Sequence, residues 1–490
     1  MSALAYGFAK RHGVVVLDLG ETAVVGLREG ADPSALVEVR RVVGRRLTIE
    51  AMAGSAFDRK LSEVYGDGLA SAAGAEGMET TGLDGLVDEI PATADLLDIT
   101  DDAPIIRLIN GLIAEAVRLG ASDIHIEPYE TTLVIRVRVD GVLREVLTLQ
   151  SRLAPLIVSR VKVMARLDIA EKRLPQDGRI SLSLGGRSLD VRVSTLPARA
   201  GERLVMRILD KEQAGLGLKD LGMGPETLEA FAAALREPNG IVLVTGPTGS
   251  GKTTTLYAGL QRLNDQTRNI LTIEDPVEYG IDGIGQTQVN TKVGMTFAAG
   301  LRAILRQDPD VVMVGEIRDA ETAQIAVQAS LTGHLVLSTV HTNDAAGAVT
   351  RLRDMGVEPF LLASTLRLVV AQRLVRRLCE DCRSEEAADP ATLRLLKLPK
   401  GSRVWRAHGC AACAQTGYVG RVGLYETVRI DDRIRRLINE NADEAAIAAI
   451  GEQDGGSLGQ RAREAVLAGL TTPEEALRVT RQETADHGEL

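Results

Sequence analysis

Aromatic side chains and net positive charge are both scarce in this chain of 490 residues. It has one Trp, seven Tyr and five Phe, so its cores must be built from Ala, Val, Leu and Ile, and little aromatic surface is left for stacking on nucleic acid bases. With 57 Lys and Arg against 67 Asp and Glu, the formal net charge is −10, which gives no general attraction for polyanions. Although a local basic patch would escape this count, we expect no nucleic acid partner.

Long apolar runs are missing as well. No segment approaches the roughly 18 consecutive apolar residues of a membrane-spanning helix. Residues 1–20 contain only the short apolar run Val14–Leu17, where a signal peptide has a longer one. We therefore expect a cytoplasmic protein unless a partner carries it elsewhere. In other respects the composition is that of a soluble globular protein, long enough for about three or four compact units.

Cysteine occurs only four times, as the pairs Cys379/Cys382 and Cys410/Cys413. Four cysteines are too few for a disulfide scaffold in a chain of this length. A gap of two residues lets both sulfurs of a pair face one ion, and two such pairs complete a tetrahedral site with no open position, which predicts structural zinc. Redox chemistry of the thioredoxin type needs only one pair, and unrelated buried thiols are the remaining alternative.

The first half of the chain has two patterns of apolar residues. Residues 66–82 are rich in Gly, Ala, Ser, Thr and acids, which predicts a flexible connection, and residues 105–120 then have helical spacing. Apolar and polar residues alternate across residues 132–149, with Asp140-Gly141 as a hairpin turn, and alternation returns around Gly185-Gly186. These patterns predict a mixed α/β domain.

From Gly240 onward, short apolar strands are separated by segments with helical spacing. The expected strands are residues 241–245, 270–273, 311–314 and 335–338. This alternation is typical of a parallel sheet covered by helices. Near the end, residues 472–475 (Thr-Pro-Glu-Glu) have the order of a capping box with a first-turn proline, which predicts a final helix.

A glycine-rich segment follows directly after the first of these strands. It satisfies the P-loop pattern, before a helix expected to begin near Thr254, and consists of Gly246, Pro247, Thr248, Gly249, Ser250, Gly251, Lys252 and Thr253. Backbone N–H groups in such a loop point at a phosphate chain, Lys252 reaches the β and γ phosphates, and the Thr253 hydroxyl ligates Mg²⁺. We predict that the loop and Thr254 bind nucleotide; a chance glycine-rich turn is the alternative.

Hydrolysis also needs a carboxylate for Mg²⁺ and a group that orients the attacking water. Two strands run into Glu274 and Glu316, and the carboxyl ends of parallel strands line one edge of a sheet, so both acids are expected near the P-loop. The alternative is that these acids only cap helices. His334 and His341 flank the next strand, where a phosphate-sensing histidine and an ordinary surface histidine fit the pattern equally well.

Taken in order, these motifs resemble those of the hexameric secretion ATPases of the type II secretion and type IV pilus class. Residues 272–279 are similar to that family's Asp box, residues 305–319 to its Walker B segment, in which the family also has Glu at the position of Glu316, and residues 332–344 to its His box. Further matches upstream are residues 120–128, 138–141, 174–179 and 201–203.

The resemblance implies an α/β fold with a RecA-like P-loop core, an upstream PAS-like α/β domain, a small N-terminal domain and a tetracysteine zinc module. It implies ATP, Mg²⁺ and Zn²⁺ as cofactors and a homohexamer. Glu274, Glu316, Lys252 and His341 are then catalytic, and Glu316 joins Thr253 as a magnesium ligand. In the family, arginines of the upstream domain bind the nucleotide phosphates. Arg192 and Arg207 occupy the matching positions, and Arg302 and Arg306 resemble a further pair that faces the site.

The predicted domains follow from these patterns and from the resemblance. They are a partner-binding domain at residues 1–90, a linker at 91–104, an α/β domain (N2) at 105–212, the ATPase domain at 217–376, the zinc module at 377–425 and a helical region at 426–490.

The zinc module favours type II secretion or pilus assembly over pilus retraction, whose ATPases usually lack it, and residues 6–13 resemble the first domain of the secretion branch. The resemblance implies a cytoplasmic ATPase, peripheral at the inner face of the inner membrane, that powers pseudopilus assembly and protein export. Its implied partners are the cytoplasmic domain of the inner-membrane L protein and the platform F protein. A pilus assembly motor, a nucleic-acid translocase and a nucleotide-sensing scaffold without turnover are the alternatives.

Overall fold

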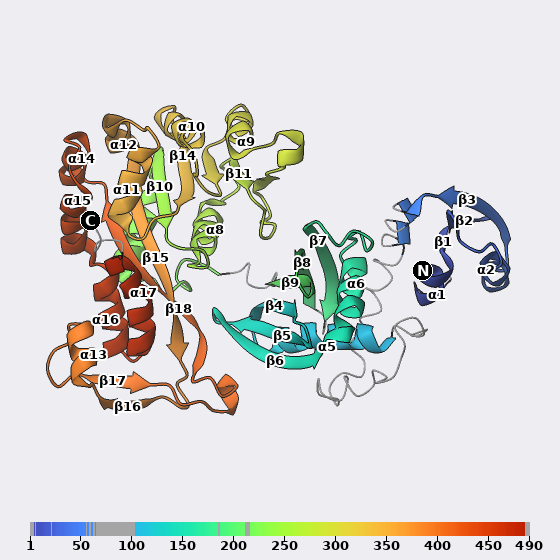
Figure 1. Cartoon of the computed structure of the whole chain (residues 1–490). Helices are drawn as coiled ribbons and strands as arrows, with labels where there is room; N and C mark the ends of the chain where they lie inside the picture. Colours follow the sequence, from blue (N-terminus) through green and yellow to red (C-terminus); the bar gives the residue numbers. More distant parts are fainter. Residues whose placement is uncertain are drawn as a thin grey trace. The chain divides into compact units, whose positions relative to one another are not determined.

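The computed structural model of the protein describes residues 4, 6–20, 22–54, 56, 57, 60, 61, 64, 103–184, 187–210 and 216–485. The chain divides into two compact units, Met1–Glu212 and Gln213–Leu490. Figure 1 shows their elements. Within the described residues, no helix is both long enough and apolar enough to cross a membrane. The flexible connection predicted at residues 66–82, most of the predicted linker and the predicted Gly185-Gly186 turn lie outside the described residues.

A small three-stranded sheet begins the first unit. Strand β2 pairs antiparallel with β1 and parallel with β3, and valines of β1, β2 and α2 form a core beneath it. The elements are α1 (Tyr6–His12), β1 (Val14–Leu19), β2 (Thr22–Arg28), α2 (Ala35–Val43) and β3 (Arg46–Met52).

A six-stranded antiparallel sheet forms the rest of the first unit, in the order β6-β5-β4-β9-β8-β7. Its elements are α5 (Ala103–Arg118), β4 (Ala121–Pro128), β5 (Thr132–Val139), β6 (Val142–Gln150), α6 (Ala154–Met164), β7 (Gln176–Leu184), β8 (Arg187–Ala198) and β9 (Gly201–Asp210). The predicted helix at residues 105–120 and the hairpin are confirmed. Asp140 and Gly141 take positive φ of 49° and 84°, as a tight two-residue turn requires. Apolar residues of alternate strand positions pack with α5 and α6, which leaves the arginines of these strands on the other face.

A seven-stranded sheet lies at the centre of the second unit, in the order β12-β11-β13-β14-β10-β15-β18. The strands are β10 (Gly240–Thr245), β11 (Ile270–Glu274), β12 (Gly285–Gln288), β13 (Val311–Val314), β14 (Leu335–Val340), β15 (Leu366–Leu378) and β18 (Tyr418–Arg429). All four predicted strands are present and parallel. Strand β18 is the exception, because it pairs antiparallel with β15.

Helices cover both faces of this sheet (Figure 1). They are α7 (Pro225–Ala234), α8 (Lys252–Leu263), α9 (Phe297–Ile304), α10 (Ala320–Leu331), α11 (Ala345–Asp354), α12 (Pro359–Thr365), α14 (Asp432–Asn439), α15 (Glu444–Gly455), α16 (Leu458–Leu467) and α17 (Pro473–Ala485). Strand β10 shows why two faces are needed. Ile241 and Leu243 pack into one apolar core and Val242 and Val244 into another, so every side chain of the strand's centre is buried.

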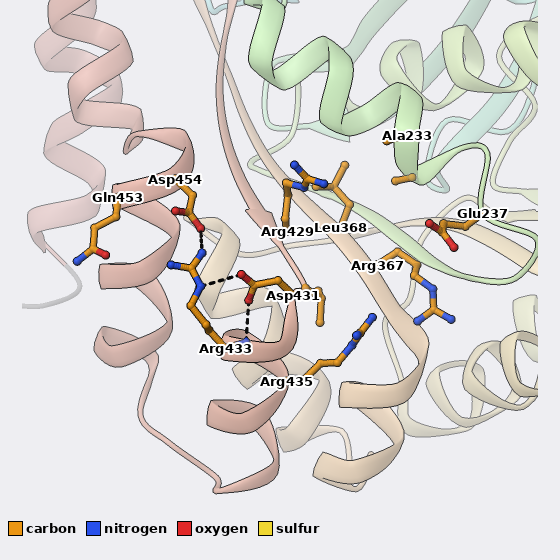
Figure 2. A pocket seen from close by; sticks show the side chains of 12 residues that line it. Ala233, Glu237, Arg367, Leu368, Arg429, Asp431, Arg433, Arg435, Gln453 and Asp454 are labelled. Atoms are coloured by element: carbon orange, nitrogen blue, oxygen red, sulfur yellow. Dashed lines mark hydrogen bonds and ion pairs between the residues drawn. The ribbon is translucent and has the colours of Figure 1, made fainter.

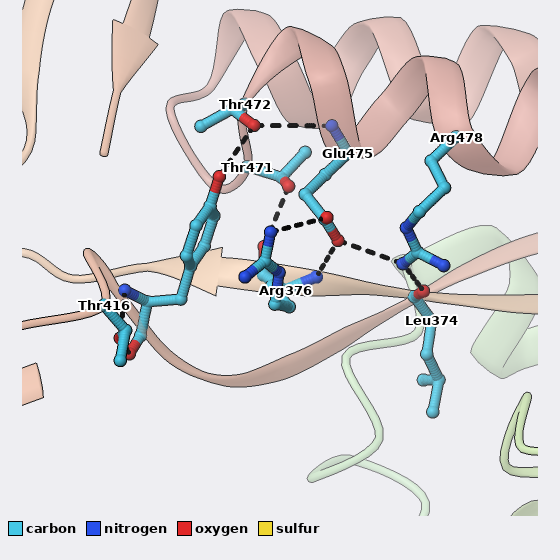
Figure 3. A network of polar contacts seen from close by, with 8 residues as sticks. Leu374, Arg376, Thr416, Thr471, Thr472, Glu475 and Arg478 are labelled. Carbon is cyan, nitrogen blue, oxygen red and sulfur yellow. Dashed lines mark hydrogen bonds and ion pairs between the residues drawn. The ribbon is translucent and has the colours of Figure 1, made fainter. Parts of the chain in front are cut away.

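The long strands β15 and β18 continue into the cysteine-bearing segment, which contains β16 (Ser384–Ala387), α13 (Pro390–Leu395) and β17 (Arg403–Arg406). The final helix α17 begins at Pro473 as predicted, and the Thr472 hydroxyl accepts the Glu475 N–H at 3.4 Å. The Glu475 carboxylate, however, accepts hydrogen bonds from Arg376 of β15 at 2.9 and 3.1 Å and from Arg478 at 3.0 Å (Figure 3). This glutamate therefore fastens α17 to the sheet.

Candidate functional site

The P-loop connects the carboxyl end of β10 to the first turn of α8. The helix begins at Lys252, two residues before the predicted start at Thr254. Gly246 and Gly251 have positive φ of 145° and 87°. A Cβ at Gly246 would lie 2.4 Å from the Gln372 carbonyl oxygen, and one at Gly251 would lie 2.9 Å from the Gln372 side-chain nitrogen. Close backbone approach as well as φ therefore requires glycine at both positions.

Gln372 of β15 forms the floor of the P-loop and was not predicted as a site residue. It is 2% exposed, and its side-chain oxygen accepts a hydrogen bond from the Thr255 hydroxyl at 2.7 Å. The one available signal was an amide side chain within the otherwise apolar strand segment that precedes Arg373. Gln372 thus ties the phosphate-binding loop to the strand that leads into the cysteine segment.

The Lys252 ammonium group donates to the carbonyl oxygens of Gly246 and Pro247 at 2.8 and 3.0 Å. Burial lowers the pKa of Lys252 to about 8, an effect that the nearby Glu316 charge opposes and Arg373 reinforces. The Ser250 hydroxyl is buried and has no hydrogen-bond partner within the described residues. A buried donor of this kind beside a lysine fits a bound phosphate oxygen. Thr253 lies exposed in the first turn of α8.

Glu316 follows β13 at the same edge of the sheet. Its side chain is 13% exposed and pairs with Arg318 at 2.5 Å and with the His341 ring at 3.3 Å. His341, just after β14, therefore lies beside Glu316, whereas the His334 ring contacts the Ala329 carbonyl oxygen at 2.8 Å. Sequence reasoning assigned no role to Arg318. The structure thus brings Lys252, Glu316 and His341 together from three adjacent strands, β10, β13 and β14.

Glu274 ends β11 and is only 2% exposed. Its carboxylate accepts hydrogen bonds from the Tyr257 hydroxyl, from Thr272 at 2.5 Å and from the Gln286 amide at 3.2 Å. Burial raises the pKa of Glu274, and these three hydrogen bonds oppose the rise. Burial also raises the pKa of Tyr257. Both carboxylate oxygens of Glu274 are therefore engaged by uncharged donors.

The arginines expected at the phosphates occupy two places. In the first unit, Arg192 of β8 lies opposite Arg207 of β9, whose guanidinium pairs with Asp123 of β4 at 2.9 Å. In the second unit, Arg302 of α9 pairs with Glu321 of α10 at 2.6 Å, and Arg306 donates to the Arg302 carbonyl oxygen at 2.9 Å.

The four cysteine sulfurs all lie within 4.8 Å of one another. Three of the distances, between Cys379 and Cys410, Cys382 and Cys413, and Cys410 and Cys413, are 3.8, 3.9 and 3.7 Å. A tetrahedral zinc site with Zn–S bonds of about 2.3 Å has sulfurs about 3.8 Å apart. Backbone N–H groups of Cys410 and Gly417 each donate to the Cys413 sulfur at 3.1 Å, as they would to a thiolate. The donor set fits a structural metal ion.

Residues 98–478 match the family model described as "Type II/IV secretion system protein", and residues 3–65 match a model of the N-terminal domain of "GSPII protein E". The chain belongs to the type II/IV secretion system protein family. Among its relatives in this family, the type II secretion system protein E of Pseudomonas aeruginosa is 56% identical over 484 residues, which cover 98% of this chain and 96% of the relative. The type II secretion system ATPase E of Vibrio cholerae is 53% identical over 489 residues, 98% and 97% of the two chains.

Solved structures confirm the fold of this secretion family member. The pilus retraction motor PilT with bound ADP is 28% identical, with a TM-score of 0.52 over 75% of this chain and 95% of that one. The ATPase DotB of Legionella pneumophila has a TM-score of 0.58 at 22% identity, over 77% and 96% of the two chains. The predicted class, an α/β P-loop ATPase with a small N-terminal domain and a cysteine cluster, is confirmed.

Proposed function

We propose that this chain is a Mg²⁺-dependent ATPase that powers pseudopilus assembly and protein export by a type II secretion system. One observation carries the catalytic part of the proposal: the P-loop lysine and the carboxylate of Glu316 meet at one edge of a parallel sheet. The names of the relatives from Pseudomonas aeruginosa and Vibrio cholerae support the secretion part.

In this proposal, the P-loop amides, Ser250 and Lys252 hold the phosphates of ATP. Thr253 and Glu316 hold Mg²⁺, which when bound neutralises developing charge on the transferred phosphoryl group. His341 positions Glu316 through their 3.3 Å contact. Glu274 accepts the proton of the attacking water, after one of its present donors gives way to that water. Its raised pKa suits a general base, because a base works best with a pKa closer to the working pH.

We further propose a homohexamer in which Arg192 and Arg207 reach the nucleotide phosphates, so that hydrolysis is coupled to motion of the first unit. The proposed partners are the cytoplasmic domain of the inner-membrane L protein and the platform F protein, which would hold the motor at the inner face of the inner membrane. The match of residues 3–65 to the N-terminal domain of GSPII protein E supports this branch. A bound zinc ion at the four cysteines would keep that segment folded.

The test is the ATPase rate of the full-length chain with and without Mg²⁺. Turnover is expected to collapse in Lys252→Ala and Glu316→Ala, and full turnover in either variant would contradict the proposed site. ATP binding without turnover in the wild type would indicate a nucleotide-sensing scaffold instead.

A type IV pilus assembly ATPase is the second candidate, since a pilus motor is among the structural matches. Co-purification of the full-length chain with pilus components of the membrane, and not with the L protein, would favour it.

A further inference from the structure

A cavity of about 760 Å³ lies at the end of the second unit's sheet that is opposite the P-loop. It is bounded by the start of β15 and the end of β18, whereas the P-loop follows the carboxyl end of β10. Small-molecule sites have volumes of about 300 to 1,000 Å³. The cavity is therefore large enough for a ligand and separate from the proposed catalytic site.

Charged side chains dominate the lining of this cavity (Figure 2). On one side, Arg433 pairs with Asp431 at 2.8 Å and with Asp454. Two carboxylates thus already compensate this guanidinium, and neither it nor its partners need a ligand.

The other side holds Arg367, Arg429 and Arg435, whose charges are poorly compensated. Within the described part of the chain, Arg429 makes no hydrogen bond or ion pair, and Arg367 donates only to uncharged oxygens. Arg435 pairs with Asp432 at 2.9 Å, but the Asp432 side chain is 92% exposed, so water screens this pair strongly.

Two of these arginines also act on one another. Burial lowers the pKa of Arg367, and the positive charge of Arg435 lowers it further, while Glu237 opposes both effects. In Figure 2 the two guanidinium groups point toward the same part of the cavity. An anion placed between them would relieve this repulsion and accept several charge-assisted hydrogen bonds.

We propose that Arg367, Arg429 and Arg435 form a binding site for a phosphate group carried by a larger molecule. Guanidinium forks match the oxygen geometry of phosphate, and a doubly charged group suits three converging arginines. The volume exceeds what phosphate alone would fill, so the ligand carries an organic part. Glu237 and the acids around Arg433 would repel a polyacidic peptide, which favours one compact anion. A soluble phosphorylated molecule and a phospholipid headgroup share this chemistry.

The test is a calorimetric titration of the full-length chain with inorganic pyrophosphate, while saturating ADP occupies the P-loop and Mg²⁺ is absent so that pyrophosphate stays free. The double variant Arg429→Gln/Arg435→Gln should bind pyrophosphate at least about tenfold more weakly than the wild type. Arg436→Gln is the matched control, because Arg436 is the exposed neighbour on the same helix and does not line the cavity. Without pyrophosphate, the melting temperature and ATPase rate of all variants should equal those of the wild type.

A parallel co-sedimentation with phosphatidylglycerol vesicles distinguishes the two sources of phosphate. Pyrophosphate binding that the double variant loses supports a soluble ligand. Vesicle binding that it loses, without pyrophosphate binding, assigns the phosphate to a lipid headgroup. If the double variant equals Arg436→Gln in both measurements, the proposed site is wrong.

Discussion

Two buried carboxylates of the second unit have opposite ionisation behaviour. Glu274, at the edge of β11, is 2% exposed, and Glu475, at the junction of β15 and α17, is 4% exposed. Burial alone would raise the pKa of both. It does raise the pKa of Glu274, whose donors are the uncharged Tyr257, Thr272 and Gln286. The arginines around Glu475 outweigh burial and lower its pKa.

The difference teaches that the charge of the partners, not the depth of burial, decides which role a carboxylate takes. A carboxylate between guanidinium groups stays ionised and holds two elements together. One that is surrounded by hydroxyl and amide donors is held less firmly in its charged form and is ready to take up a proton. The structure therefore separates a catalytic candidate from a structural glutamate in the same unit.

Removing one arginine should break the comparison with the largest effect on stability. Arg376→Met leaves Glu475 buried with Arg478 as its one remaining guanidinium partner, which should cost about 3 kcal/mol in the free energy of unfolding. Urea denaturation measures this cost. Arg377→Met is the matched control, because Arg377 is 51% exposed and pairs with an exposed glutamate, and its cost should stay within about 0.5 kcal/mol. Equal costs would contradict the structural role of the Glu475 network.

The pH dependence of stability should sharpen the comparison. The pKa of Glu475 is lower in the folded chain than its ordinary value of 4.5, so its stabilisation is complete above that pH and is lost as the pH falls toward the folded pKa. Glu475→Gln should therefore cost about 1 to 3 kcal/mol at pH 7 and less under acid conditions. Denaturant unfolding at several pH values checks this, and a cost that grows on acidification would be inconsistent with a lowered pKa.

Removing one donor from Glu274 should have a smaller effect, on catalysis. Tyr257→Phe takes away a hydrogen bond that favours the ionised carboxylate, so the pKa of Glu274 should rise further. The acid limb of the ATPase pH profile should then move to higher pH, with turnover at neutral pH reduced by up to about tenfold.

Tyr279→Phe is the control for this change. Its ring packs against Tyr257 at 4.7 Å between centroids, while the hydroxyl that bonds Glu274 belongs to Tyr257. An identical pH profile in both variants would show that the hydroxyl is irrelevant to Glu274.

The sequence was sufficient to predict features that are local in the chain. Apolar runs predicted four strands of the second sheet, and the P-loop pattern predicted the strand, turn and helix around Lys252. The spacing of the cysteines predicted their cluster, because each pair is closed by a short turn.

Features that depend on long-range contacts were not predicted. Strand β18 joins the ATPase sheet beside β15 across the whole cysteine segment, and periodicity gives no pairing partner. Gln372 lies under the P-loop for the same reason, from a strand more than a hundred residues away. The hydroxyl of Tyr257 and the amide of Gln286 around Glu274 come from α8 and β12, so the sequence identified this carboxylate but not the environment that sets its pKa.

The most direct test of the account is to measure ATP binding and ATP hydrolysis in the same preparation of Glu274→Gln. The substitution keeps the size of the side chain and its hydrogen-bonding capacity but removes the base. The account predicts an affinity for ATP close to that of the wild type, with turnover at or below about 1% of the wild-type rate. Turnover near the wild-type rate would contradict the role of Glu274 as the base, and loss of ATP binding would show that the residue shapes the nucleotide site instead.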